Sequence, residues 1–207
     1  MIKNILIKDE SNKLYINSKI FSKNIAKKSL LDIKKLIFPP IDIYKLSQIM
    51  IDEESYKYIT FFSTAQEITN IIMNNLHDFP APHFITEKCW TKKKIENKLA
   101  TLVITDMTSG VGGNVLNFAK YFRYVNAIEI DNQKYKCLVN NINIYEFKNV
   151  NYYNTDSYDF LINKDYIVQD IVFFDPPWGG KDYKLYNNLK LTFNNLPIED
   201  ICKKLEN

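Results

Sequence analysis

Short apolar runs recur along the second half of the chain and alternate with segments of helical periodicity. Four of these runs predict strands, at residues 102–106, 125–130, 150–153 and 171–174. Apolar residues at helical spacing separate the first three runs and predict helices from residue 115 and over residues 133–145. Strands that alternate with helices in this way predict right-handed crossovers and a parallel, doubly wound α/β sheet.

The first hundred residues predict a less regular arrangement. Apolar stretches at residues 2–7 and 14–16 flank a polar turn, which predicts a β-hairpin. The predicted helices are residues 27–38, ended by Pro39, residues 42–50, capped by Asp42, and a helix capped by Ser63 or Thr64 that continues to residue 76. Residues 77–98 contain two prolines and a run of lysines, and we expect a surface excursion there.

Composition is that of an ordinary globular protein. At 207 residues, 46% of them hydrophobic, the chain is long enough for one domain with a small extension. No apolar run is long enough to span a bilayer and no signal peptide is recognisable, so we expect an intracellular protein of the nucleus or cytoplasm that does not bind membranes. The many Lys, Asn, Ile and Tyr residues are typical of an AT-rich genome, such as that of a virus or protist. His77, His83 and Cys89 lack a fourth ligand, so no metal site is predicted.

A glycine-rich turn follows the first predicted strand, which ends at Asp106. The turn contains Gly110, Gly112 and Gly113. Three spaced glycines are also typical of dinucleotide sites, but Asp106 would repel a pyrophosphate. A carboxylate at this place suits the ammonium group of S-adenosylmethionine, and glycines let the backbone approach a ligand closely. We therefore predict that S-adenosylmethionine is the cofactor.

Acidic residues also end the second and third predicted strands. Glu129 can accept hydrogen bonds from both ribose hydroxyls of the cofactor, and Asp156 can accept one from the adenine amine. The carboxyl ends of parallel strands share one edge of a sheet, where ligands bind in open α/β folds. These acids and the glycine turn thus predict a single cofactor site.

The sequence Asp-Pro-Pro-Trp-Gly-Gly follows the fourth strand at residues 175–180. The continuous apolar run before it predicts a strand that is buried on both faces. Because proline cannot continue a central strand, the chain must leave the sheet at the edge where ligands bind. The Asp175 carboxylate, the Pro176 carbonyl and the Trp178 ring are the groups needed to hold a planar base by its exocyclic amine.

Together these motifs resemble those of the trimethylguanosine synthases, which methylate the guanine N2 of a 7-methylguanosine RNA cap. The resemblance extends from Phe61 to about Tyr183. It is carried by Phe62-Ser63-Thr64 with Glu67, Asp106, residues 109–114, residues 127–131, and Pro-Pro-Trp-Gly-Gly at 176–180 with Asp182 and Tyr183. It implies a Rossmann-like class I methyltransferase fold, with an N-terminal α/β extension over residues 1–60 and an S-adenosylmethionine-dependent methyltransferase domain over residues 61–207.

By this resemblance the chain is an enzyme that acts on capped RNA. The implied catalytic residues are Asp175, Pro176 and Trp178. The first two aim the N2 amine at the methyl group, and Trp178 stacks on the cationic cap base. Lys181 and Tyr183 are the implied contacts of the cap phosphates. The implied cofactor ligands are Thr64, Asp106, Gly110, Gly112, Gly113, Asn114, Glu129, Asp156 and Asp175.

Departures from the family pattern leave alternatives open. The family commonly has Ser where this chain has Asp175, and acid-Pro-Pro-aromatic is the pattern of adenine-N6 methyltransferases. Adenine N6, or guanine N2 in ribosomal RNA, is therefore an alternative target. Residues 65–67 read Ala-Gln-Glu where the family tends to Pro-Glu. The fold also predicts three strands after the fourth, for which the chain has too few residues. A partner chain or a missing segment would then complete the sheet, or the chain is a truncated, non-catalytic relic that binds cofactor or cap within an assembly.

Overall fold

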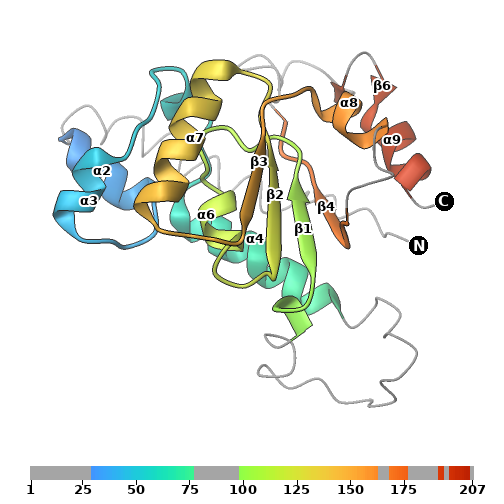
Figure 1. Cartoon of the computed structure of the whole chain (residues 1–207), viewed down its shortest axis with the longest axis horizontal. Helices are drawn as coiled ribbons and strands as arrows, with labels where there is room; N and C mark the ends of the chain where they lie inside the picture. Colours follow the sequence, from blue (N-terminus) through green and yellow to red (C-terminus); the bar gives the residue numbers. More distant parts are fainter. Residues whose placement is uncertain (1–28, 77–97, 163–167, 177–190, 194–195, 206–207) are drawn as a thin grey trace, which may run out of the picture.

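The computed structural model describes residues 29–76, 98–162, 168–176, 191–193 and 196–205 (Figure 1). The hairpin predicted at residues 2–16 lies outside these ranges, as does all of the excursion predicted at residues 77–98 except its last residue. Within them, every helix is too short or too polar to cross a membrane.

A parallel sheet of four strands forms the centre of the structure (Figure 1). Its strands are β1 (Val103–Asp106), β2 (Tyr124–Ile128), β3 (Val150–Tyr153) and β4 (Ile171–Phe173). Their spatial order is β3-β2-β1-β4, and Ile104 of β1 pairs with Val125 on one side and Ile171 on the other. The predicted parallel sheet is confirmed.

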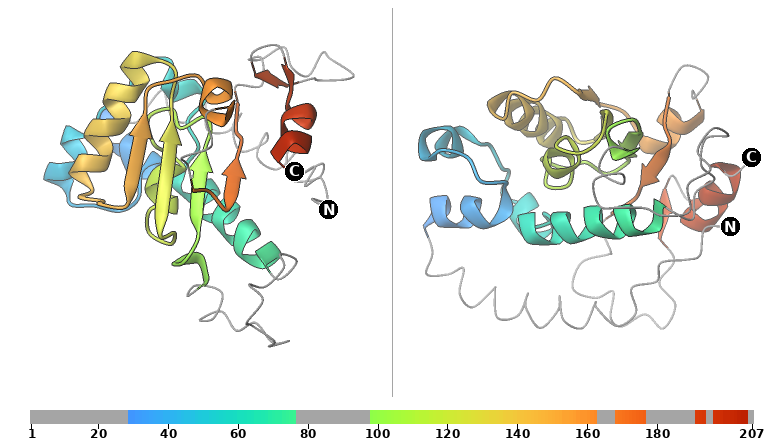
Figure 2. Two further views of the ribbon diagram at one scale, coloured as in Figure 1. Left: turned by 45° about the vertical axis from the view of Figure 1, so that its right-hand side comes forward. Right: turned by 90° about the horizontal axis from the view of Figure 1, so that it is seen from below.

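Helices cover both faces of this sheet (Figure 2). The crossover helices are α6 (Val115–Phe118) after β1, α7 (Asn132–Ile144) after β2 and α8 (Ser157–Ile162) after β3. The side chains of β4 and of Phe174, which follows it, alternate between the two faces of the sheet. Ile171 and Phe173 pack against the hydrophobic cluster that includes α6 and α7, whereas Val172 and Phe174 pack against the cluster that includes α8. The predicted doubly wound arrangement is therefore confirmed.

Strand β4 is less buried than its apolar sequence predicted. All three of its residues are half-buried. Both faces of β4 carry apolar contacts, but β1 is its single hydrogen-bonded partner among the described strands. A strand that is paired on one side keeps some of its surface open, and its sequence alone does not reveal that position.

Residues 29–76 form helices that pack on the same face as α6 and α7. These elements are α2 (Leu30–Ile37), α3 (Ile43–Gln48), the 3-10 turn η1 (Ser55–Lys57) and α4 (Phe62–Asn75). Ile37 and Leu76 are buried in the cluster that also contains strand residues. Asn141 of α7 fastens the segment, since its amide group donates to the carbonyls of Met50 and Val111 and accepts the Met50 N–H. The boundary predicted at residue 60 stays a prediction.

The three predicted helices of this segment are present, but their bounds differ: α2 begins at Leu30 after the cap Ser29 rather than at residue 27, and α3 ends at Gln48 rather than at residue 50. Asp42 caps α3 with its side chain, as predicted. The predicted cap at Ser63 or Thr64 is wrong, because α4 begins at Phe62 and both residues lie in its first turn. The preceding residue, Phe61, is extended and packs against the core. The residue at the N-cap position of α4 is therefore an apolar one that packs against the core, and no side-chain hydrogen bond among the described residues caps the helix.

The last described residues form a separate antiparallel pair and a helix. These elements are β5 (Thr192–Phe193), β6 (Leu196–Pro197) and α9 (Ile198–Leu205), and α9 was predicted. Neither β5 nor β6 pairs with the four-stranded sheet. The ring of Phe193 lies 5.3 Å from that of Phe174, and Ile201 is buried beside α8. This segment therefore covers the α8 face.

Candidate active site

Three carboxylates lie at the edge of the sheet where β1, β2 and β4 end. Asp106 is the last residue of β1, Glu129 follows β2, and Asp175 follows β4 by two residues. They are close enough that the charges of Asp175 and Glu129 both raise the pKa of Asp106. The structure therefore brings together three of the acids that the sequence assigned to the site.

Asp106 is fully buried, and its hydrogen bonding is incomplete. Its Oδ1 accepts the Thr108 N–H at 3.0 Å, whereas no donor from the described residues reaches Oδ2. Burial raises the pKa of Asp106 to about 8. A buried carboxylate without a full set of partners is costly, so this position favours a cationic ligand.

The three glycines of the turn have different surroundings. Gly110 and Gly112 have φ angles of 53° and 103°, which glycine adopts without strain. A Cβ on Gly112 would lie 3.2 Å from Cδ1 of Leu138, and one on Gly113 would lie 2.8 Å from the carbonyl oxygen of Thr60. A Cβ on Gly110 would meet no heavy atom of the described residues within 4 Å. Gly112 and Gly113 thus serve packing of the turn, and Gly110 borders open space.

Glu129 is 8% exposed and uses one carboxylate oxygen to hold the glycine turn and the other to hold the segment after β2. Oε2 accepts the Gly110 N–H at 2.8 Å, and Oε1 accepts the Asp131 N–H at 2.8 Å. Burial raises the pKa of Glu129, and these two hydrogen bonds oppose that rise. Each carboxylate oxygen has a second lone pair, so Glu129 can also accept hydroxyl groups of a ligand.

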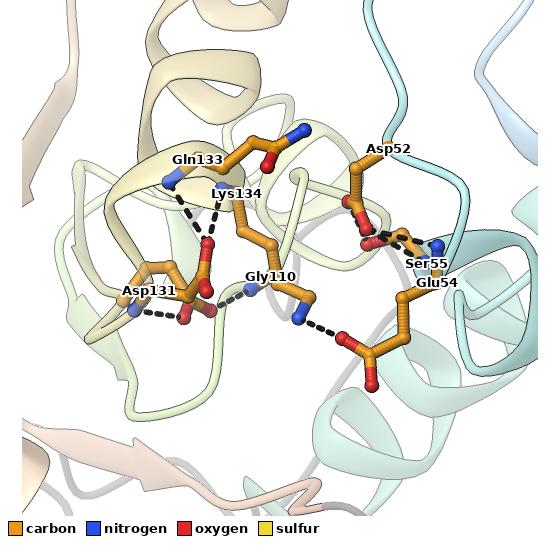
Figure 3. A network of polar contacts seen from close by, with 8 residues as sticks. Asp52, Glu54, Ser55, Gly110, Asp131, Gln133 and Lys134 are labelled. Atoms are coloured by element: carbon orange, nitrogen blue, oxygen red, sulfur yellow. Dashed lines mark hydrogen bonds and ion pairs between the residues drawn. The ribbon is translucent and has the colours of Figure 1, made fainter.

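A polar network connects this region to the N-terminal helices (Figure 3). Asp131 caps α7 by accepting the N–H groups of Gln133 and Lys134, both at 2.8 Å. The Lys134 Nζ donates to Glu54 at 2.6 Å, immediately before η1. The end of β2, the start of α7 and η1 are thereby held together.

Asp175 is held by two threonines. Its Oδ2 accepts the Thr60 hydroxyl at 3.1 Å, and its N–H donates to Thr108 Oγ1 at 3.0 Å. The Asn114 amide donates in turn to Thr60 Oγ1 at 3.2 Å. Pro176, the next residue, is buried. Because the Thr108 N–H also binds Asp106, one residue connects the two acids.

Asp156 and Thr64 occupy the starts of helices. Asp156 Oδ1 accepts the N–H groups of Tyr158 and Asp159 at 2.7 and 3.3 Å, and so caps α8. Thr64 is half-buried in the first turn of α4. The cofactor roles predicted for both residues stay predictions.

A model of the RNA cap guanine-N2 methyltransferase family matches residues 101–207. The match covers more than half of the chain and includes the glycine turn and all three clustered carboxylates. The chain belongs to this family. It is an S-adenosylmethionine-dependent methyltransferase of Rossmann-like α/β fold.

Three relatives show how far the similarity of this methyltransferase extends. "Uncharacterized protein L320" of Acanthamoeba polyphaga mimivirus is 55% identical over 93% of this chain and 77% of its own length. The trimethylguanosine synthases of Schizosaccharomyces pombe and Saccharomyces cerevisiae are 35% and 29% identical over 44% and 48% of this chain. The matched parts span 39% and 36% of those two proteins.

The described residues fit the cofactor of the family. Oδ2 of Asp106 is buried without a described partner, which suits the ammonium group of S-adenosylmethionine. Gly110 borders open space next to Glu129, whose oxygens can accept ribose hydroxyls. Asp106, Gly110 and Glu129 would therefore hold the cofactor in this methyltransferase.

Some residues of the site were predicted but lie outside the described ranges, and others were missed. Trp178, Lys181 and Tyr183 belong to the first group, and their roles stay predictions. Thr60 and Thr108 belong to the second group. Thr60 is separated from Asp175 by 115 positions, and its one sequence signal is a hydroxyl within the aromatic stretch 56–62.

Proposed function

We propose that this methyltransferase methylates the exocyclic N2 amine of a 7-methylguanosine cap on RNA. The observation that carries the proposal is the Asp175 carboxylate, which two threonines hold beside the cofactor acid Asp106. Membership of the cap guanine-N2 family supports the same substrate.

A carboxylate at this position matches the hydrogen-bond donors of guanine, although acid-Pro-Pro-aromatic is also the pattern of adenine-N6 methyltransferases. A carboxylate only accepts hydrogen bonds. Guanine offers two adjacent donors, N1–H and the N2 amine, whereas adenine offers its N6 amine beside the acceptor N1. The two oxygens of Asp175 can therefore both bind guanine, but the second would face a lone pair of adenine.

The protein contributes mainly alignment to this reaction. When bound, S-adenosylmethionine supplies a methyl group that passes from its sulfur to the nitrogen of the acceptor amine, leaving S-adenosylhomocysteine and a proton. Asp175 and the Pro176 carbonyl hold the amine for attack, and alignment of this kind contributes up to roughly 7–11 kcal/mol in well-oriented systems. Trp178 stacks on the cationic base, and Lys181 and Tyr183 bind the cap phosphates in this proposal.

A substitution of Asp175 separates guanine from adenine as the target. We expect Asp175→Asn to lower kcat/KM for a 7-methylguanosine cap by about 10- to 100-fold, because the amide would present a donor to a donor of the base. An adenine-N6 enzyme would tolerate this change, since an amide can accept from N6 and donate to N1 of adenine. Methylation of cap analogues and of adenine-containing RNA by both proteins provides the measurement.

Asp170→Asn is the matched control for this experiment. Asp170 precedes β4 at its opposite end, and its Oδ2 accepts the Val103 N–H at 2.7 Å. The amide oxygen of Asn can accept the same hydrogen bond, so activity should be preserved. Unchanged cap methylation by Asp175→Asn would argue against the proposed role of Asp175.

A further inference from the structure

The hydroxyl of Thr60 lies between the glycine turn and Asp175. It accepts a hydrogen bond from the Asn114 amide at 3.2 Å and donates one to Asp175 Oδ2 at 3.1 Å. Asn114 belongs to the segment between β1 and α6, and Asp175 follows β4. A single side chain from the N-terminal segment therefore connects two separate parts of the candidate site.

The backbone of Thr60 is fixed independently of its hydroxyl. A Cβ on Gly113 would lie 2.8 Å from the Thr60 carbonyl oxygen and 3.5 Å from its nitrogen, so these two segments pack backbone against backbone. Only glycine permits this approach. The position of Thr60 is thus set by packing, and its side chain is directed at Asp175 by two hydrogen bonds.

Two threonines bind different parts of Asp175, one its backbone and the other its carboxylate. Thr108 accepts its backbone N–H at 3.0 Å and places the residue at the sheet edge. Thr60 donates to the carboxylate itself and so restrains its rotation. A carboxylate that must hold an acceptor amine needs a defined rotation, because small misplacement of reacting groups is costly to the rate.

We propose that Thr60 is a positioning residue that orients the Asp175 carboxylate toward the acceptor amine. The inference rests on the proposed role of Asp175 in holding that amine. It places a contribution to the reaction outside the region that the family model matches, which begins at residue 101. The N-terminal segment then contributes a residue to the active site in addition to its packing in the hydrophobic core.

The test replaces the hydroxyl and keeps the shape. We expect Thr60→Val to lower kcat by about 10- to 100-fold, the range for a lost hydrogen bond to a charged group. The acceptor used is whichever capped-guanosine or adenine analogue the wild-type protein methylates. The affinity for S-adenosylmethionine, measured by calorimetry, should fall less than kcat does. Thr60 has no described hydrogen bond to Asp106 or Glu129, whereas its partners Asn114 and Asp175 are among the cofactor ligands that the resemblance implies. Thr60→Ser keeps the hydroxyl and should restore most of the rate.

Thr69→Val is the matched control. Thr69 is 1% exposed in α4, and its hydroxyl binds the Ala65 carbonyl and the Asn117 amide, away from Asp175. Its loss should lower the thermal midpoint and leave kcat of the folded protein unchanged. Thr60→Val should show the opposite pattern, with a large change in kcat and a small change in midpoint.

The outcomes separate this inference from the proposed function. A normal kcat for Thr60→Val, or a loss that Thr60→Ser does not restore, would overturn the positioning role. An equal loss of kcat in Thr69→Val would also overturn it, because the effect would then be general destabilisation. Transfer to adenine with a large Thr60→Val effect would keep the positioning role and overturn the cap substrate.

Discussion

Replacing Trp178 by alanine is expected to abolish methylation of a 7-methylguanosine cap and to leave S-adenosylmethionine binding nearly intact. A cation over a desolvated tryptophan face gains ~2 kcal/mol, and stacking of a base adds roughly 1–3 kcal/mol. The combined loss of about 3–5 kcal/mol corresponds to a fall of roughly 150- to 5,000-fold in kcat/KM. Cap methylation assays and calorimetry with the cofactor measure the two effects separately.

Two further proteins control this experiment. Trp178→Phe keeps an aromatic face and should retain part of the activity. Trp90→Ala removes the other tryptophan of the chain and should leave the activity unchanged. If Trp178→Ala lowered cofactor affinity and thermal stability together, Trp178 would be a packing residue rather than the cap contact.

Replacing Asp106 by asparagine is expected to weaken S-adenosylmethionine binding and to change its pH dependence. Loss of a charge-assisted hydrogen bond costs ~1.5–3 kcal/mol, or about 10- to 100-fold in Kd. In the wild-type protein the pKa of Asp106 is raised to about 8, so at pH 6 the carboxyl group is mostly protonated. Binding of an ammonium group requires the ionised form, and the wild-type affinity should rise up to tenfold per pH unit between pH 6 and 8. The asparagine variant should lack this rise, which calorimetry at several pH values measures.

The same raised pKa predicts an opposite effect on the stability of the ligand-free protein. The folded state binds a proton at Asp106 more tightly than the unfolded state does, so the free energy of unfolding falls as pH rises from about 4 to about 8. Asp106→Asn should therefore be more stable than wild type at pH 8, although it binds cofactor poorly. Asp42→Asn, which keeps a cap on α3, should change neither property. Normal cofactor affinity in Asp106→Asn at all pH values would contradict the assignment.

The parallel sheet was predictable because each strand is a short apolar run followed by polar residues. Asp106 and Glu129 directly follow or end such runs, and the carboxyl ends of parallel strands share one edge. Their clustering with Asp175 therefore followed from topology alone. The half-burial of β4 did not, because it depends on which strand pairs with it.

Details that depend on long-range packing were not predictable. The N-cap position of α4 is occupied by Phe61, which packs against the core, and not by one of the polar residues after it. The need for glycine at position 113 comes from the backbone of Thr60, and at position 112 from Leu138. In each case the residue requirement comes from a segment that is distant in the sequence and that the fold brings close.

The most direct test of the central claim is to identify the atom that receives the methyl group. The protein is incubated with labelled S-adenosylmethionine and, separately, with a 7-methylguanosine cap analogue, an unmethylated cap analogue, and adenine-containing RNA and DNA. We predict label on guanine N2 of the 7-methylated cap, with clearly weaker reaction of the unmethylated cap because it lacks the positive charge. Equal reaction of both caps, transfer to adenine, or no transfer to any of these substrates would contradict the claim.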